Sequence, residues 1–204
     1  MTSTPTAKRE KLTLTDRLRV VTAGFIDPIV TFLAKIKITP DFLTILGMLA
    51  HGLFAWLIIE GQMRWAGLAV ALLSPLDALD GSLARKLNKT QSKFGAFFDS
   101  TLDRLAEIIL YAGYIIYFAN AENSWMVAAA YLALTGSLMV SYTRSKAEAL
   151  GLSCKVGILS RVERYIIIIV SLALNLPEYG LIVLAVGTYF TALQRMYHVW
   201  KQTR

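Results

Sequence analysis

Residues 42–60 read FLTILGMLAHGLFAWLIIE and hold no acidic or basic side chain other than His51 before they reach Glu60. A stretch of this kind is typical of a helix that crosses a bilayer, which needs about 20 mainly apolar residues. Five further apolar segments of helix length follow, separated by polar or helix-ending residues. They cover residues 65–84, 94–119, 124–149, 159–176 and 179–200. Because an open sheet could not satisfy its backbone in lipid, we expect an all-α integral membrane protein with six transmembrane helices.

The composition of the whole chain supports this interpretation. Of its 204 residues, 55% are hydrophobic and 17% are charged, whereas soluble domains average about 45–50% apolar and about 25% charged residues. The high hydrophobic content excludes a disordered chain, and 13 glycines among 204 residues exclude a collagen. A disulfide scaffold is excluded because Cys154 is the one cysteine. We expect a single membrane domain over residues 1–204. Residues 1–37 would form a cytoplasmic tail and a juxtamembrane helix, and residues 38–204 the six-helix core.

The N-terminal region differs from the segments that follow it. Residues 16–36 read DRLRVVTAGFIDPIVTFLAKI, and Asp27-Pro28 interrupts their apolar character. This pattern, without a small-residue cleavage site, does not fit a secretory signal peptide. An amphipathic helix that lies in the membrane interface explains it better than a short first span, because a carboxylate at mid-span is costly.

The net charge of +7 has a strongly uneven distribution. When the gaps between segments are assigned alternately to the two sides of the membrane, one side receives all 21 Lys and Arg residues except Arg64. The positive-inside rule therefore predicts a multi-pass protein of the cell membrane with both termini and the basic loops in the cytoplasm. Such charge sets the topology and contacts anionic lipid headgroups, so nucleic-acid binding is not indicated.

Four aspartates lie within the predicted membrane segments, where a charged carboxylate is energetically unfavourable. Asp77 and Asp80 end the second segment, three residues apart, and Asp99 and Asp103 begin the third, four residues apart. Each pair shares one helix face, and the two antiparallel segments place both pairs near the cytoplasm. Pairing with nearby arginines or lysines would explain one pair but hardly two. All-oxygen donors favour Mg²⁺ or Mn²⁺, and two such ions would suit four aspartates and would hold a pyrophosphate.

The stretch from Asp77 to Asp103, DALDGSLARKLNKTQSKFGAFFDSTLD, resembles the signature of the CDP-alcohol phosphotransferase family. That signature is D-x2-D-G-x2-A-R, a spacer, and G-x3-D-x3-D. The fixed positions are matched by Asp77, Asp80, Gly81, Ala84, Arg85, Gly95, Asp99 and Asp103. The resemblance implies an enzyme that displaces CMP from a CDP-linked lipid with an alcohol acceptor, using two Mg²⁺ or Mn²⁺ ions. Those ions would be held by the four aspartates, and Asp103 would also be the base that deprotonates the acceptor.

The resemblance also implies a site for the nucleotide. Gly81, Ala84 and Arg85 would contact the diphosphate, and Ser92 would supply a loop hydroxyl near the nucleotide. The turn at residues 39–44 resembles the family's cytidine-contacting T-P-[ND]-x2-T pattern, through Thr39, Pro40, Asp41 and Thr44. From the residues alone this turn is only a helix start, with Thr39 or Asp41 as a candidate N-cap.

A second set of basic residues bears on the acceptor. Several cationic side chains near a metal site suggest an anionic acceptor such as a polyol phosphate. The segments SYTRSKAEALGL (141–152), SRVER (160–164) and QRMYHVW (194–200) resemble the phosphatidylinositol phosphate synthase branch, whose acceptor is inositol 1-phosphate. The predicted acceptor-phosphate residues are Ser141, Arg144, Lys146, Arg161, Arg164 and Arg195.

Three other functions are alternatives to this hypothesis. Phosphatidylglycerophosphate synthase, with glycerol 3-phosphate as acceptor, is the main alternative, and an archaetidyl equivalent on ether lipids is another. A divalent-cation transporter is a distant alternative, because nothing polar continues a path beyond the aspartates. The family is usually dimeric, so the resemblance also implies a homodimer.

Overall fold

The computed structural model describes residues 14–87 and 93–204, apart from the side chains of residues 14–23, 25, 77 and 78. Every regular element in this part of the chain is an α-helix, which confirms the predicted all-α class. The helices are α1 (Leu14–Lys35), α2 (Pro40–Ile59), α3 (Met63–Leu73), α4 (Leu76–Lys86), α5 (Lys93–Asn120), α6 (Ser124–Ala149), α7 (Arg161–Ala173) and α8 (Pro177–Gln202).

The second apolar segment is two helices, where the sequence predicted one from 65 to 84. Helix α3 ends at Leu73 and α4 begins at Leu76, with Ser74 and Pro75 between them. Proline has no backbone N–H to donate, and its ring clashes with the carbonyl four residues earlier. The break therefore falls at Pro75 although the apolar character continues across it. All the signature residues from Asp77 to Arg85 lie on α4 and keep their predicted spacing.

Two close contacts between helices explain how the bundle holds together. Helix α2 packs on α5, where a Cβ added at Gly113 would lie 2.7 Å from the Cα of Ala55. Helix α6 packs on α8, where a Cβ at Gly136 would lie 2.0 Å from Oγ1 of Thr188. Small residues let helix backbones approach closely, which is the usual basis of packing in membranes. The main core is built on these contacts and includes Phe54, Ile58, Leu110, Tyr114, Phe118 and Leu184.

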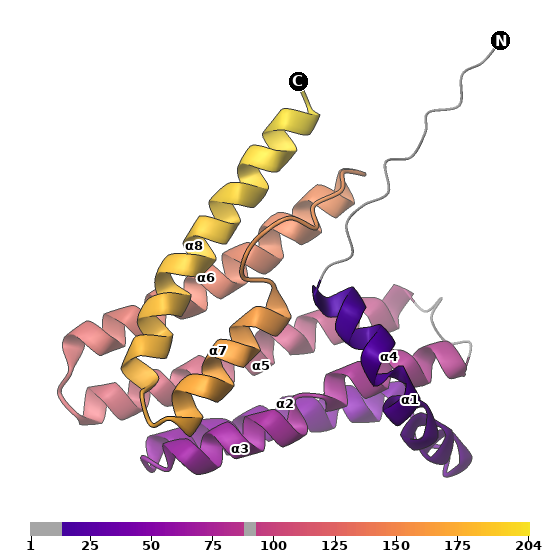
Figure 1. Cartoon of the computed structure of the whole chain (residues 1–204), viewed down its shortest axis with the longest axis horizontal. Coiled ribbons are helices and arrows are strands. Elements are labelled where there is room, and N and C mark those ends of the chain that lie inside the picture. The colour runs from indigo at the N-terminus through magenta and orange to yellow at the C-terminus, as the bar shows by residue number, and fades with distance from the viewer. Residues whose placement is uncertain (1–13, 88–92) are drawn as a thin grey trace.

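The helices diverge from one end of the molecule (Figure 1). The short turns α2–α3, α5–α6 and α7–α8 lie together at one end, and from there α6 and α8 lean away from α2 and α5. The ends of α4 and α6, the starts of α5 and α7 and the C-terminus lie toward the opposite, wider end. These ends are the ones that the positive-inside rule predicts to face the cytoplasm.

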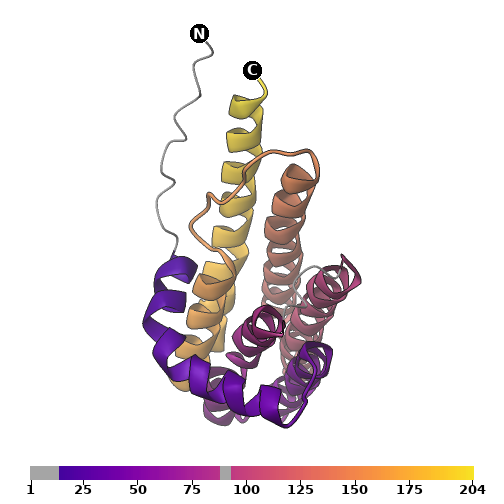
Figure 2. The ribbon, with the colours of Figure 1, turned by 90° about the vertical axis from the view of Figure 1, so that its right-hand side faces the viewer.

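Helix α1 crosses the ends of the other helices rather than running beside them (Figure 2). It changes direction along its length, and Pro28 lies inside it. Val30 of α1 is buried with Leu43 and Leu83 in a small second core, whereas Asp27 and Phe32 are exposed. The helix predicted for residues 16–36 is thus confirmed as a helix, and its described part from Ile26 onward has a packed face.

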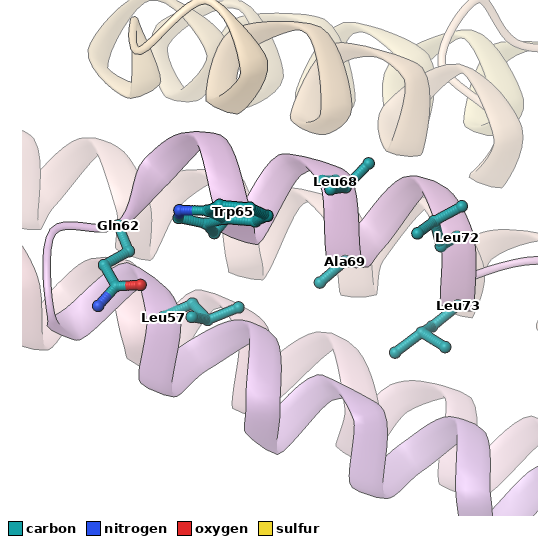
Figure 3. Close-up of a pocket in the computed structure, with 7 residues that line it drawn as sticks. All are labelled: Leu57, Gln62, Trp65, Leu68, Ala69, Leu72 and Leu73. Atoms are coloured by element: carbon teal, nitrogen blue, oxygen red, sulfur yellow. The ribbon is translucent and has the colours of Figure 1, made fainter.

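Many large apolar side chains lie on the outer surface. On α8 the exposed residues follow a helical stripe, which comprises Tyr179, Val183, Val186, Phe190, Leu193 and Tyr197. By length and apolar composition, α2 and α6 could each cross a membrane among the described residues. An apolar groove of about 390 Å³ lies between α2 and α3, lined by Leu57, Trp65 and Leu72 among others (Figure 3). It contains none of the predicted site residues and begins at the α2–α3 turn.

Candidate active site

The predicted site residues come from helix ends that lie toward the wide end of the bundle. They are on the first turn of α2, on α4, on the first half of α5, on the last turns of α6 and α8, and on the first turn of α7. Alternating antiparallel helices bring such ends to one side. The separate stretches that the sequence singled out therefore share one side of the molecule (Figure 1).

Thr39 and Thr44 have distinct roles at the start of α2. The side chain of Thr39 accepts a hydrogen bond from the N–H of Phe42 at 3.3 Å, which confirms Thr39 as the N-cap. Thr44, one turn into the helix, donates its hydroxyl to Oδ2 of Asp80 at 2.8 Å. Pro40 occupies the first helical position, and Asp41 is exposed. One residue of the predicted nucleotide turn thus contacts a predicted metal aspartate directly.

Asp80 is the most buried of the predicted metal aspartates whose side chains are described, with 4% of its surface exposed. Besides Thr44, it accepts a hydrogen bond from the N–H of Gly81 at 2.5 Å. A buried carboxylate needs such partners to remain charged. A Cβ at Gly81 would meet only Nη1 of Arg85, at 3.6 Å, so the space beside Asp80 is not filled by another helix. This opening supports the predicted approach of a diphosphate.

Arg85 is exposed and donates to Oγ of Ser82, 2.8 Å away, one turn earlier on α4. Ala84, beside it, is half-buried. Lys86 donates to Oγ1 of Thr31 and so joins α4 to α1. Ser92, predicted to contact the nucleotide, lies outside the described residues.

Asp103 and Arg161 join the two predicted halves of the site. Nη1 of Arg161 lies 2.6 Å from Oδ2 of Asp103, and its Nη2 lies 2.8 Å from Oδ1. The guanidinium therefore covers both carboxylate oxygens in a bidentate pair. The side chains are 29% and 12% exposed, respectively. Asp99, one turn earlier on α5, lies within reach of the charges of Asp103, Arg161 and Arg104.

A second ion pair lies one turn deeper between the same helices. Nη2 of Arg164 lies 2.5 Å from Oε1 of Glu107, and each side chain is only 2% exposed. Arg104 lies between the two pairs, with its Nη2 3.5 Å from Asp103 and its Nε 3.7 Å from Oε2 of Glu107. Neither that Nε nor that Oε2 makes a hydrogen bond within the described part of the chain. Arg164 was predicted to bind acceptor phosphate, and the structure gives it a buried carboxylate as its partner.

Glu107 is a residue that the sequence analysis missed. It lies four residues after Asp103, on the same face of α5 and within a predicted span. The sequence therefore already indicated Glu107, because it is a fifth carboxylate within a predicted span and shares a helix face with Asp99 and Asp103. Tyr165 and His51 join the same network, because Nε2 of His51 lies 2.6 Å from the Tyr165 hydroxyl and the Arg161 guanidinium lies 5.8 Å from the Tyr165 ring.

The other predicted acceptor residues have other contacts. Arg195 is 3% exposed and donates to two backbone carbonyls, those of Val156 and Val140, which joins α8 to α6 and to the α6–α7 connection. Arg144 is exposed and pairs with Glu148 at 2.8 Å on its own helix. Ser141 donates to the carbonyl of Ser137, and Lys146 is exposed. Of the predicted acceptor set, Arg161 alone is shown in direct contact with a signature aspartate among the described residues.

The carboxylates suit a hard divalent cation by their chemistry. Asp80, Asp99 and Asp103 offer only oxygen donors, and Gly81 leaves open space beside the first of them. Among the side chains that the structure describes, no three His, Cys, Asp or Glu residues form a group that could hold a metal ion. The side chain of Asp77 lies outside that description, so the four-aspartate set stays a prediction.

A bundle of helices that includes two of membrane-spanning length, with Asp80, Asp99 and Asp103 toward one end, is typical of a helical membrane protein with an acidic site. Residues 37–193 match the family model described as CDP-alcohol phosphatidyltransferase. The chain belongs to that family, whose members are integral membrane transferases. This confirms the resemblance drawn from the signature.

Two of the similar proteins are named as synthases of inositol phosphate lipids. The chain is 37% identical, over 93% of its length and 95% of the relative, to the archaetidylinositol phosphate synthase of Methanothermobacter thermautotrophicus. It is 36% identical, over 78% of each chain, to the phosphatidylinositol phosphate synthase of Cutibacterium acnes.

The fold is also that of a solved enzyme. The structure of Mycobacterium tuberculosis phosphatidylinositol phosphate synthase with CDP-DAG bound matches with a TM-score of 0.78 and 30% sequence identity. That match covers 86% of this chain and 93% of the other. Another structure of the same enzyme, with the same TM-score, is in complex with manganese and citrate.

Proposed function

We propose that this chain transfers the phosphatidyl group of CDP-diacylglycerol, or its ether-lipid equivalent, to inositol 1-phosphate and releases CMP. The observation that carries the proposal is the contact between Asp103 and Arg161. It places a carboxylate that could take a hydroxyl proton beside a guanidinium suited to a phosphate. The names of the relatives support the same acceptor, since they include both phosphatidylinositol and archaetidylinositol phosphate synthases.

In the proposed reaction the acceptor hydroxyl attacks the phosphorus that carries the lipid. A new P–O bond forms, the P–O bond to CMP breaks with its electron pair leaving on CMP, and Asp103 takes the hydroxyl proton. Two Mg²⁺ or Mn²⁺ ions, held by Asp77, Asp80, Asp99 and Asp103, would offset the charge that develops on the leaving phosphate. Manganese in the mycobacterial relative supports this choice of metal.

The CDP-lipid would lie along α4, which is the helix that carries most of the predicted nucleotide residues. Gly81 and Ala84 leave room beside Asp80, and Arg85 is exposed for a phosphate oxygen. Thr44 acts on the substrate indirectly, because its hydroxyl orients Asp80. The predicted contacts of Thr39, Pro40, Asp41 and Ser92 with the nucleotide belong to the same proposal.

We further propose that six segments cross the membrane, with α3 and α4 together forming the second and α1 lying in the interface. The single membrane domain would place both termini and the active site in the cytoplasm, at the wide end of the bundle. Among the helices of the described residues, α2 and α6 are long and apolar enough for this by themselves. Helix α5 carries Asp99, Asp103, Arg104 and Glu107, which lowers its apolar character at the site. A homodimer in the cell membrane completes the proposal.

The test is incorporation of labelled inositol 1-phosphate into lipid by the purified full chain, with CDP-diacylglycerol and Mg²⁺. We expect a phosphorylated inositol lipid and an equal amount of CMP. Product from glycerol 3-phosphate in place of inositol 1-phosphate would overturn the acceptor and favour a phosphatidylglycerophosphate synthase. An ether analogue of the CDP-lipid, assayed in parallel, decides between the two lipid classes.

A further inference from the structure

We propose that Thr191 of α8 is a positioning residue for acceptor binding, because it fixes the chain that leads into α7. This inference rests on the proposed function, in which the start of α7 forms part of the site for the acceptor phosphate. The chain concerned is the α6–α7 connection, residues 150–160, which runs from the end of α6 along α8 to the start of α7 (Figure 2). Thr191 is buried and was not among the site residues that the sequence predicted.

Three side chains on one face of α8 hold this connection by its backbone. The three contacts are Gln202 Nε2 with the Ser153 carbonyl at 2.7 Å, Arg195 Nε with the Val156 carbonyl at 2.9 Å, and the Leu159 N–H with Thr191 Oγ1 at 3.0 Å. Positions 191, 195 and 202 share a helix face because they are four and seven residues apart. The connection therefore runs antiparallel to α8 along this face, and the contact with Thr191 is the last of the three before α7 begins.

The hydroxyl of Thr191 is oriented by its own helix. It donates to the carbonyl of Gly187 at 2.8 Å, so its oxygen accepts from the N–H of Leu159. The carbonyl of Leu159 in turn accepts from Nη1 of Arg164 at 3.4 Å. The peptide groups on both sides of Leu159 are thus held, one by α8 and the other by α7, just before the first residue of α7.

The connection also packs closely on Thr191 and its helix. Gly157 has a φ of +129°, and a Cβ added to it would lie 2.5 Å from Cγ2 of Thr191. A Cβ added at Gly187 would lie 2.4 Å from Cδ1 of Leu159. Glycine at these two positions lets the connection approach α8 where any other residue would collide. These contacts add to the hydrogen bonds in fixing the register of the connection on α8.

The start of α7, into which the connection leads, lies at the site. Its first residue, Arg161, is two residues after Leu159 and contacts Asp103 of α5. Groups that recognise a ligand must be held within about 0.5 Å of their working geometry. Without the Thr191 hydroxyl, the N–H of Leu159 loses its partner and the start of α7 can shift. Acceptor affinity should then fall, whereas the CDP-lipid, proposed to lie along α4, should bind as before.

Thr191→Val tests this role, because valine keeps the methyl group that faces Gly157 but cannot accept a hydrogen bond. We expect the KM for inositol 1-phosphate to rise about tenfold, which corresponds to about 1.4 kcal/mol. The KM for CDP-diacylglycerol and kcat should each change by less than about twofold, the pattern of an interaction that contributes to binding alone. Thr191→Ser returns the hydroxyl and should restore the KM of the parent.

Amide hydrogen exchange gives a second readout that needs no turnover. In detergent without substrates, we expect peptides that cover residues 157–160 to exchange faster in Thr191→Val than in the parent, because the N–H of Leu159 has lost its acceptor. Thr191→Ser should exchange at the rate of the parent. Peptides from α4 should be unchanged in both variants.

Thr188→Val is the matched control. Thr188 is also buried on α8, one turn earlier, but its hydroxyl donates to carbonyls of its own helix, those of Leu184 and Ala185. Its thermal midpoint measures the cost of removing a buried hydroxyl from α8, and its KM for inositol 1-phosphate should equal that of the parent. Gln202→Ala is a second test variant, which removes an exposed side chain and frees the far end of the connection. Its KM for inositol 1-phosphate should rise, but by less than in Thr191→Val.

An unchanged KM for inositol 1-phosphate, or unchanged exchange at residues 157–160, in Thr191→Val would overturn the proposal. So would equal losses for both substrates or an equal rise of KM in Thr188→Val, because the hydroxyl would then act on stability alone. If Thr191→Val does not fold, an unchanged KM in Gln202→Ala overturns the proposal by itself. A failure of the proposed function is different, because the parent would then form no lipid product from inositol 1-phosphate, while hydrogen exchange would still report whether Thr191 holds the connection.

Discussion

At the scale of single residues, Asp103 combines a low exposure of 12% with two cationic neighbours, Arg161 and Arg104. An Asp103→Asn variant keeps the size of the side chain but cannot take a proton. We expect CMP release to fall by about 10²–10⁴-fold, which is the usual contribution of a positioned base. Thermal unfolding in detergent should remain cooperative. Near-normal CMP release from a folded variant would rule out Asp103 as the base.

Thr44 permits a test of how Asp80 is held. Thr44→Val preserves shape but removes the hydroxyl that donates to Asp80 at 2.8 Å. Since Asp80 would remain buried with one donor fewer, we expect a loss of about 1–3 kcal/mol in unfolding free energy and weaker Mn²⁺ binding. Thr143→Val is the control, because the Thr143 hydroxyl donates to carbonyls of its own helix, those of Met139 and Val140. Equal effects from the two variants would show that the contact with Asp80 has no special role.

Some contacts of single residues could be predicted from the sequence, and others could not. The N-cap at Thr39 could be predicted because capping is a local property of the chain. The partners of Arg164 and Arg195 could not, since each is set by a helix far away in the sequence. A basic residue near a helix end fits a ligand site and a structural contact equally well. Only the packing of α7 on α5 and of α8 on α6 separates the two.

At the scale of helices, the pair formed by Glu107 and Arg164 joins α5 to α7 where both side chains are buried. Glu107→Gln removes the negative charge and leaves the Arg164 guanidinium buried without a counter-charge. We expect the unfolding free energy to fall by about 3–5 kcal/mol. The double variant Glu107→Leu with Arg164→Met should recover much of that loss, because an apolar pair needs no such compensation. A single variant as stable as the parent would contradict this account of the α5–α7 contact.

The contact of α2 with α5 depends on the absence of a side chain at Gly113. Gly113→Ala would place a Cβ 2.7 Å from the Ala55 Cα, so the helices must separate, and we expect a loss of about 1–3 kcal/mol. Gly52→Ala is the matched control on α2, since a Cβ there meets nothing within 4 Å. In water that change would stabilise a helix by about 0.5–1 kcal/mol. Thermal unfolding of both variants in one detergent measures the difference, and similar midpoints would contradict the close approach.

Helix boundaries, too, could be predicted where the sequence carries a strong local signal and were missed elsewhere. Segments 42–60, 94–119 and 124–149 were predicted within two residues of the ends of α2, α5 and α6, because Pro40, the run before Lys93 and Asn123 are strong local signals. The break at Ser74–Pro75 was missed, since Leu72, Leu73 and Leu76 keep the hydropathy high across it. The proline is visible in the sequence, but hydropathy does not register its missing N–H.

At the scale of the whole molecule, the charge distribution and the fold agree. The sequence assigned every Lys and Arg except Arg64 to one side, and the structure gathers the corresponding helix ends at the wide end of the bundle (Figure 1). Arg64 lies instead at the start of α3, beside the short turns. The exact placement of the site within that wide end depends on packing between helices that are distant in the sequence, and this packing cannot be predicted from any one segment.

The proposed orientation can be tested with single cysteines and a membrane-impermeant maleimide. The natural Cys154 is buried, and burial raises the pKa of its thiol. A raised pKa keeps the thiol protonated at pH 7, so its labelling should be slow and should increase only as the pH rises toward that pKa. Cys154 therefore gives a low background, and a Cys154→Ser parent provides the control for it.

Ser124→Cys lies beside the α5–α6 turn and Thr203→Cys near the C-terminus, and both positions are exposed. In intact cells we expect labelling at position 124 without permeabilisation, and at position 203 only after it. The physical reason is that the basic ends of the helices resist transfer across the membrane, whereas the turn near Ser124 carries no basic residue. The reverse pattern would place the termini and the aspartate site outside the cell and would overturn the proposed orientation.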